Sequence, residues 1–233
     1  MFGQGGGISF NSGFPVPITG SQVFGNPTMP SDYLYSEGCA SISDSSGNLL
    51  FYSNGEKVWN RNNSVMSNGN NMMGFYSSSS SAFIIPVPSS DSLYYLFTTD
   101  GLERYLQNGL RYSIIDMCLD NGNGGVISMQ KNILVLDTVS EKLCAVANPN
   151  GTDVWLIVHK FFSDAFYAYQ ITPFGINPPV ISNVGSVHVG ISGFFNGCGG
   201  AIGQMKASSD GNKIGLAFSN SSPSVVEVLI LTL

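Results

Sequence analysis

The feature that most constrains the fold is a pattern of short apolar runs, separated by turn-forming residues, that occurs four times. Its first occurrence, residues 36–66, contains the runs Cys39–Ile42, Leu49–Tyr52 and Val58–Trp59. Gly, Asn, Asp and Ser fill the gaps, and Gly and Asn tolerate the positive φ angles that tight hairpin turns require. The pattern therefore predicts three antiparallel strands joined by short loops.

The other occurrences give the length of the repeating unit. With Ile42, Ile84, Ala145 and Ala207 taken as equivalent positions, the units are about 42, 61 and 62 residues long. Sheet units of about 40–50 residues, some with enlarged loops, are typical of β-propellers, because each small sheet buries its two apolar faces by stacking on neighbours. We predict an all-β fold, a β-propeller with four to five recognisable blades of antiparallel strands, incomplete, in a single domain over residues 1–233.

The apolar runs also assign individual strands to the scheme. Apolar patterns around Ile8–Phe10 and Val16–Ile18 predict two short strands near the N-terminus. In the third unit, Ile133–Leu136 and Lys142–Val146 are assigned as successive strands, followed by a central strand at Val154–Val158.

Composition and charge exclude several kinds of partner. Charged residues make up 10% of the chain, and 9 Lys and Arg face 15 Asp and Glu. Binding to nucleic acid or to an anionic membrane surface depends on clustered Lys and Arg, which this chain does not have. No apolar run approaches the ~18 residues of a spanning helix. A surface rich in Ser, Asn and Gly is more typical of secreted β-proteins than of cytosolic enzymes.

The segment Glu37–Asn62 is also the most distinctive in the chain. Its pattern is E-G-C-A-S-I-S-D-x-x-G-N-L-L-F-Y-x-x-G-x-x-V-W-N-R-N. It resembles the N-terminal propeller region of large Bacteroidota surface proteins, which are gliding-motility-associated type IX secretion cargo proteins with a C-terminal sorting domain. Further likeness lies in Gly109–Met117, Asn150–Trp155 and Met205–Gly211. The resemblance implies an extracellular or cell-surface location and a role in adhesion or protein binding, and it implies no catalytic residues.

The chain also departs from that family. Its members open with an aromatic W-Y-F-G segment after a signal peptide, whereas here only Phe2-Gly3 follows Met1. A sorting domain is not present either. We therefore expect the chain to be a fragment, or a shortened relative, of a longer secreted protein with neighbouring domains.

The predicted binding residues are Glu37, Trp59, Asn60 and Arg61. An acidic residue entering a strand, beside an aromatic ring and an amide, can form a polar pocket at one end of a propeller channel. Trp59 would stack on a sugar ring and Arg61 would pair with a carboxylate. In the alternative interpretation, which we favour, Trp59 packs between blades and Arg61 satisfies turn carbonyls.

No cofactor is predicted, and the metal-binding signals are weak. His159 and His188 are the only histidines, and no Cys pair has the C-x₂-C spacing of a zinc site. His159 is expected to cap or hydrogen-bond a blade edge. The loop from Asp116 to Gly124 offers oxygen ligands for calcium, but it lacks the EF-hand spacing, so a plain Asn/Gly hairpin loop is favoured.

These observations favour a non-enzymatic binding or adhesion module that holds a protein or glycan ligand on a propeller face. The alternative is a propeller-fold hydrolase or lyase acting on polysaccharide, which needs two carboxylates that converge. Glu37, Asp100 and Asp116 are the set to test, and a separation above about 10 Å would exclude them. A third possibility is a purely structural spacer.

Overall fold

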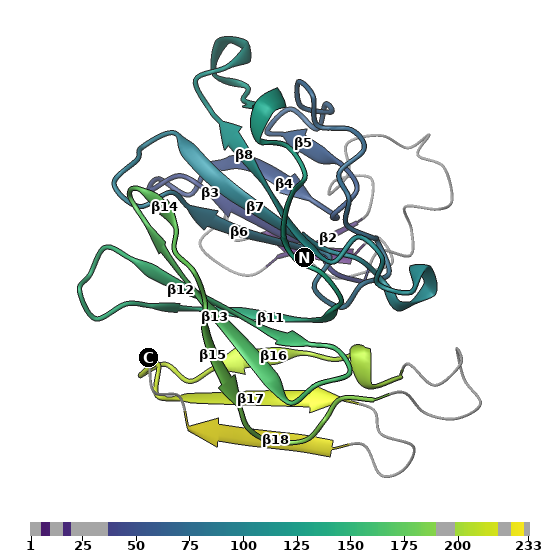
Figure 1. Ribbon diagram of the computed structural model, residues 1–233. Helices are drawn as coiled ribbons and strands as arrows, with labels where there is room; N and C mark the ends of the chain where they lie inside the picture. The colour runs from purple at the N-terminus through teal and green to yellow at the C-terminus, as the bar shows by residue number, and fades with distance from the viewer. Residues whose placement is uncertain (1–5, 10–15, 20–36, 190–198, 219–224, 231–233) are drawn as a thin grey trace.

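The computed structural model describes residues 6–9, 16–19, 37–189, 199–218 and 225–230. Over these residues the protein is all-β, and its helical segments are single 3₁₀ turns. The strands form five separate antiparallel sheets, none of which closes into a barrel within the described ranges (Figure 1). The N-terminal pair, β1 (Gly6–Ser9) and β2 (Val16–Thr19), confirms the two short strands predicted there.

The first two large sheets follow the predicted units. Sheet 1 contains β3 (Ala40–Ser43), β4 (Leu49–Ser53) and β5 (Val58–Asn60). Sheet 2 has the order β6 (Ala82–Pro86), β7 (Leu93–Thr99), β8 (Leu110–Asp116) and β10 (Ile133–Leu136), and β9 (Gly125–Val126) also pairs with β8.

The assignment of Ile133–Leu136 to the third unit is wrong. Strand β10 pairs antiparallel with β8, with Ile133 opposite Tyr112, and so forms the fourth strand of sheet 2. An apolar run at the junction of two units fits either sheet. The long connection after β8, which includes the 3₁₀ turns at Asp120–Gly122 and Ser128–Gln130, returns the chain to the free edge of that strand.

The last two sheets complete the series. Sheet 3 contains β11 (Val139–Ala147), β12 (Val154–Lys160) and β13 (Ala165–Thr172), and β13 also pairs with β14 (Gly175–Ile176) and β15 (Val180–Asn183). Sheet 4 contains β16 (Met205–Ala207), β17 (Lys213–Phe218) and β18 (Val225–Ile230).

Consecutive sheets pack face to face, and each interface has its own core. Phe51 and Leu96 lie in the cluster between sheets 1 and 2, Phe97 and Leu156 between sheets 2 and 3, and Ile157 and Leu216 between sheets 3 and 4. Adjacent residues of one strand, such as Leu156 and Ile157, thus serve two different cores, because alternate side chains point to opposite faces. This explains why the central strands are almost continuously apolar.

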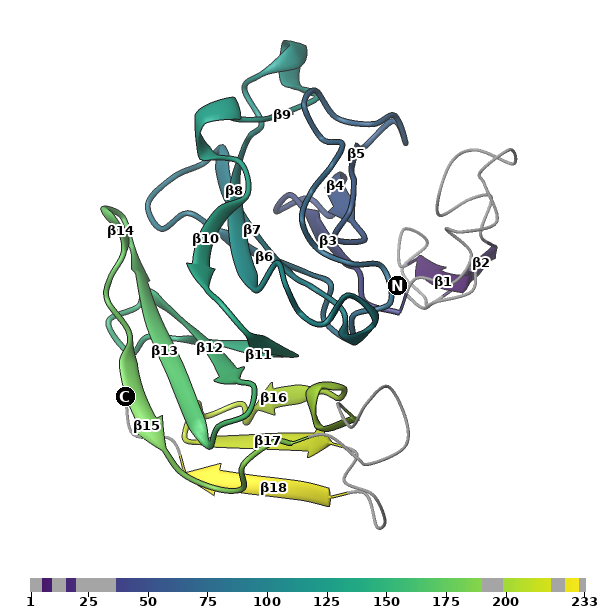
Figure 2. The same ribbon diagram turned by 45° about the vertical axis from the view of Figure 1, so that its right-hand side comes forward.

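The outer face of sheet 4 is not covered by the described residues. Val226, Val228 and Ile230 alternate along β18 and are 71%, 68% and 82% exposed. On the opposite face of the same strand, Leu229 packs against the core between sheets 3 and 4. The interfaces between the sheets are therefore buried, whereas the outer face of sheet 4, at one end of the stack, is exposed (Figure 2).

Candidate functional site

A cavity lies where the first strands of the four large sheets meet. Strand β3 lies beside β6, and β11 lies beside β16. Together with adjoining residues, these four strands line a cavity of about 680 Å³. We call it the axial cavity. Its wall is made of small or apolar side chains such as Ser41, Ala145 and Ala207, with Lys206 and Asp210 as the charged residues among its described lining.

One serine and one glutamate connect three sheets at this cavity. Ser79, which lines it, donates from its backbone N and its Oγ to Glu141 Oε2, at 2.7 and 2.8 Å. The backbone N of Leu102 donates to the other carboxylate oxygen at 2.9 Å, and Gly203 N donates to Ser79 Oγ at 3.2 Å. Burial raises the pKa of Glu141, against the effect of these hydrogen bonds. The carboxylate thus joins strand β11 of sheet 3 to two loops of sheet 2, and the Ser79 hydroxyl extends the link to Gly203, just before sheet 4.

The predicted binding residues do not surround one pocket. Trp59 is 3% exposed and its indole stacks on Tyr52, with ring centroids 5.3 Å apart and 14° between planes. Trp59 lies in β5, two strands across sheet 1 from the chain that leads Glu37 into β3, which is roughly 10 Å. Neither residue lines the cavity where the first strands meet, and neither lines the two other cavities that lie at Tyr112 and at Arg104.

The side chains next to Trp59 satisfy backbone groups. Asn60 is 4% exposed, and its Oδ1 accepts hydrogen bonds from the backbone N of Asn62 and of Ser64, at 2.9 and 3.2 Å. Arg61 Nη2 donates to the Gly122 carbonyl at 3.1 Å. The Arg61 contact is the one that the structural interpretation expects, whereas the Tyr52 ring on which Trp59 stacks belongs to the same sheet. A ligand-binding role for the four residues stays a prediction.

Glu37 occupies a different environment. It is exposed, and its backbone N donates to the Tyr76 carbonyl at 2.9 Å. Partial burial and then the nearby Glu103 carboxylate raise the pKa of Glu37, while Ser77 opposes the shift.

Two of the three carboxylates proposed for a hydrolase, Asp100 and Asp116, lie far apart. Leu93 pairs with Asp116 and Thr99 with Leu110, so Asp116 and Asp100 lie at opposite ends of the β7–β8 ladder. Seven residues of strand separate their backbones by about 20 Å. Asp100 accepts hydrogen bonds from the backbone N of Gly101 and Asn108, and Asp116 from that of Cys118. Asp100 and Asp116 therefore cannot act together as a catalytic pair.

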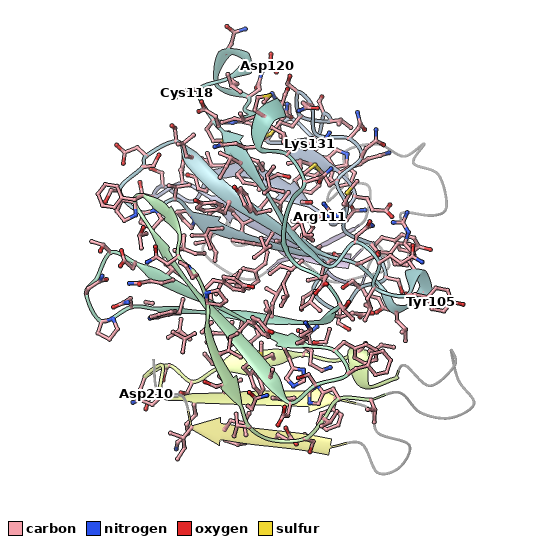
Figure 3. All side chains as sticks on the ribbon, in the orientation of Figure 1. Tyr105, Arg111, Cys118, Asp120, Lys131 and Asp210 are labelled. Carbon is pink, nitrogen blue, oxygen red and sulfur yellow. The ribbon has the colours of Figure 1, made fainter. Side chains whose placement is uncertain are left out.

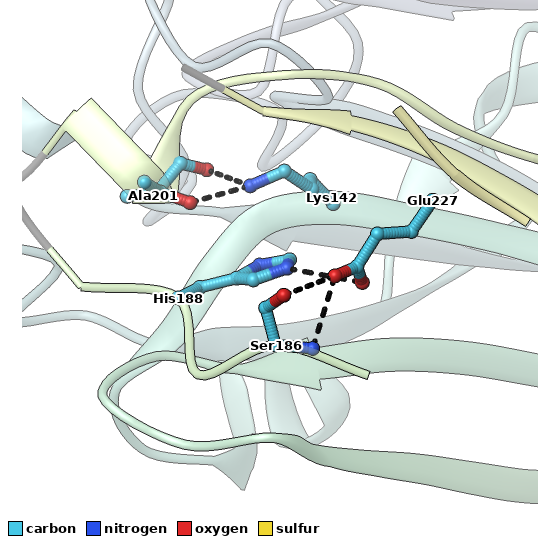
Figure 4. A network of polar contacts seen from close by, with 6 residues as sticks. Lys142, Ser186, His188, Ala201 and Glu227 are labelled. Carbon is cyan, nitrogen blue, oxygen red and sulfur yellow. Dashed lines mark hydrogen bonds and ion pairs between the residues drawn. The ribbon is translucent and has the colours of Figure 1, made fainter. Parts of the chain in front are cut away.

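A second group of buried polar residues lies between sheets 3 and 4, and sequence reasoning missed its central member. Lys142 is fully buried in β11, and its Nζ donates to the carbonyls of Gly200 and Ala201 at 2.7 and 3.0 Å (Figure 4). Burial lowers the pKa of Lys142 to about 7, although Glu141 acts in the opposite direction. The sequence signal that could have indicated this buried lysine is the adjacent charged pair Glu141-Lys142 within the otherwise apolar strand β11.

The two histidines, which are far apart in the sequence, meet in this group. Both are fully buried, and within the described residues neither ring has a hydrogen-bond partner. Burial, His188 and Lys142 lower the pKa of His159 to about 3, and burial and Lys142 lower that of His188 to about 4. Both rings are therefore neutral at pH 7, so the 4.0 Å contact from His188 Nε2 to Glu227 is not an ion pair there. His159 does not cap a blade edge as expected.

Metal binding has limited structural support. No three His, Cys, Asp or Glu side chains in the described ranges are grouped to hold a metal ion. In the loop considered for calcium, the Gly122 carbonyl already accepts a hydrogen bond from Arg61. The calcium expectation stays a prediction.

Comparison with known proteins adds no relative. No protein-family model matches the chain, and no curated protein matches it. Within the described residues, no helix has the length and apolar character needed to cross a membrane.

Proposed function

We propose that this protein is a non-enzymatic binding or adhesion module built on a β-propeller, and that it holds a protein or glycan ligand at the axial cavity. The observation that carries the proposal is the convergence of the first strands β3, β6, β11 and β16 on that one cavity. In a propeller, the innermost strands of all blades line a central channel, and loops from every blade surround its mouth.

The order of strands supports the propeller architecture. Sheets 2 and 3 each begin with a strand at the cavity and end with further strands on the outer side of the third one, β8 or β13. Four-stranded sheets stacked face to face in this order are the units of a propeller. The uncovered face of sheet 4 is where a further blade, or closure onto the first sheet, would bury Val226, Val228 and Ile230.

The chemistry of the cavity supports binding rather than catalysis. Its lining consists mainly of hydroxyl and apolar side chains, with Gln204, Lys206 and Asp210 as the amide and charged groups. The buried carboxylate of Glu141, which contacts Ser79 of the lining, accepts three hydrogen bonds from backbone and serine. Ligand sites of 300–1,000 Å³ with a few polar groups are the usual size for small ligands or for a side chain of a partner. The secreted or cell-surface setting, with neighbouring domains of a longer chain, rests on the resemblance described above.

Arrays of glycans and of extracellular proteins test this function when probed with the purified chain and two variants. Ser41 is exposed and lines the cavity, whereas Ser43, also exposed and two residues along β3, does not line it. The Ser41→Trp variant should lose the ligand, and the Ser43→Trp variant should keep it. Turnover of a polysaccharide by the wild type would favour the enzyme, and a lack of any ligand would favour the structural spacer.

A further inference from the structure

A second cavity lies between sheets 2 and 3 and shares no lining residue with the axial cavity. It has a volume of about 620 Å³ and lies between strands β8 and β10 on one side and the β13–β14 hairpin on the other (Figure 2). We call it the lateral groove. It continues outward from the core between these sheets, because Tyr95, Ile114 and Tyr169 belong to both.

Aromatic rings form much of the groove. Tyr95 and Tyr112 meet edge to face, with centroids 5.4 Å apart, and Tyr169 lies on the opposite sheet. Phe174, at the tip of the hairpin between β13 and β14, lines the groove and is 99% exposed. A fully exposed phenylalanine contributes almost nothing to the fold, so the Phe174 ring is accessible to a molecule that enters the groove.

The polar groups of the groove are available to a ligand. The hydroxyls of Tyr95, Tyr112 and Tyr169 have no hydrogen-bond partner within the described residues and are not sealed from solvent. The amides of Gln130 and Asn177 also line the groove. The Asn177 Nδ2 donates to Gln170 Oε1 at 3.2 Å, which orients the amide and leaves its oxygen open.

Every described residue that lines the groove is uncharged. The cations next to it in sequence point elsewhere: Arg111 donates to the carbonyls of Asn108 and Asn132, and Lys131 to that of Asn70 (Figure 3). Burial, Tyr167 and Asp137 raise the pKa of the Tyr169 hydroxyl. The Asp137 carboxylate itself forms an ion pair with Lys160, with Nζ and Oδ1 3.6 Å apart. A charged ligand would lose hydration here without gaining an opposite charge, so the groove suits a neutral one.

We infer that the lateral groove is a binding site for a neutral oligosaccharide. The rings of Tyr112 and Phe174, the two groove aromatics outside the buried core, offer flat apolar faces for the C–H faces of sugar rings, and Tyr112 carries a polar tip as well. Sugar hydroxyls both donate and accept hydrogen bonds, and so do the tyrosine hydroxyls and the side-chain amides that line the groove. Proline-rich peptides also bind in aromatic grooves. The backbone of such a peptide mainly accepts hydrogen bonds, so the amide oxygens of Gln130 and Asn177 would be covered without a donor.

The inference goes beyond the axial cavity and does not depend on it. Calorimetric titration of the full chain with cellohexaose, maltohexaose, an oligogalacturonate and decaproline tests it. At least one neutral hexasaccharide should bind, with the same Kd at low salt and at roughly 0.5 M salt, since no charge is involved. Binding of neither sugar, or preference for oligogalacturonate or decaproline, overturns the inference.

Variants locate the sugar. Phe174→Ala should weaken binding about fivefold through loss of an aromatic contact. Tyr112→Phe should weaken it about threefold, the effect of one hydrogen bond. Two matched controls should bind as the wild type does: Tyr94→Phe, because Tyr94 packs toward sheet 1, and Phe162→Ala, because Phe162 is 62% exposed and lies outside the groove.

The Ser41→Trp variant separates this inference from the proposed function. Sugar binding that survives Ser41→Trp and weakens in Phe174→Ala supports the lateral groove, whatever the axial cavity binds. Sugar binding that is lost in Ser41→Trp and unchanged in Phe174→Ala places the sugar in the axial cavity and overturns the inference, while the proposed function stands.

Discussion

The imidazole rings of His159 and His188 stack face to face, with centroids 3.7 Å apart and 21° between their planes. His159 lies in β12, and His188 lies in the segment after β15, where its backbone N donates to Ser163 O. Phe166 meets the first ring edge on at 4.6 Å, and Phe218 covers the second at 4.1 Å. A proton on either ring would enter an apolar site that also contains the Lys142 ammonium, so the pair is compatible with the fold only when neutral.

The first prediction is that the fold loses stability in mild acid through this pair. In the unfolded chain both histidines take up protons near pH 6.5, whereas in the fold their pKa values are about 3 and about 4. The unfolded state therefore binds more protons between these limits, and the free energy of unfolding falls as pH falls from 6.5 toward 4, by on the order of 3 kcal/mol for each histidine. Urea denaturation at several pH values measures it.

A His159→Phe, His188→Gln double variant should lose most of this pH dependence if it folds. A single His188→Gln variant, with an intermediate slope, is the second measure. Equal slopes in wild type and both variants would contradict the assignment of the acid sensitivity to this pair.

The second prediction concerns Lys142 at alkaline pH. Its folded pKa is about 7 and its unfolded value is 10.5, so the unfolded state holds the extra proton between these limits. Stability should then rise with pH by up to about 1.4 kcal/mol per unit. Lys142→Met removes this titration. The unfolding free energy of the wild type minus that of the variant should therefore increase from pH 7 to pH 10. A constant difference over that range would argue against a buried, neutral lysine.

The third prediction tests the glutamate at the axial cavity. Glu141→Ala leaves the backbone donors of Ser79 and Leu102 without an acceptor in a buried site, and should lower the free energy of unfolding by on the order of 3 kcal/mol. Asp91→Ala, at an exposed carboxylate on the β6–β7 turn, should change it by less than about 0.5 kcal/mol. Equal effects of the two substitutions, compared by chemical denaturation, would mean that Glu141 does not join the sheets.

The fourth prediction separates the two interpretations of the Trp59 motif. Because Trp59 is buried against Tyr52, Trp59→Ala should destabilise the fold by about 3–5 kcal/mol. Arg61→Ala, which loses one exposed hydrogen bond to Gly122, should cost about 1 kcal/mol or less. The thermal melting of each variant measures this. If Trp59→Ala melts like the wild type but no longer binds a ligand, the binding interpretation is correct instead.

The sequence by itself determined the secondary structure class and most strand positions. Runs such as Leu49–Tyr52 and Val154–Val158 are bounded by Gly, Asn and Asp, and short apolar runs between such turns form strands whatever lies around them. The nearly continuous apolar character of the central strands also predicted sheets that are buried on both faces, and the succession of three cores confirms this for sheets 2 and 3.

Only the tertiary structure decided which sheet β10 joins, because its pairing with β8 depends on where a long loop returns the chain. It also decided that Asp100 and Asp116 lie apart, that His159 and His188 lie together, and that Lys142 is buried. Residue type sets what a side chain can do, but its partners come from sheets that are distant in sequence. Local pattern carries no information on those partners, and so the axial cavity and the lateral groove emerged only when the sheets were assembled in space.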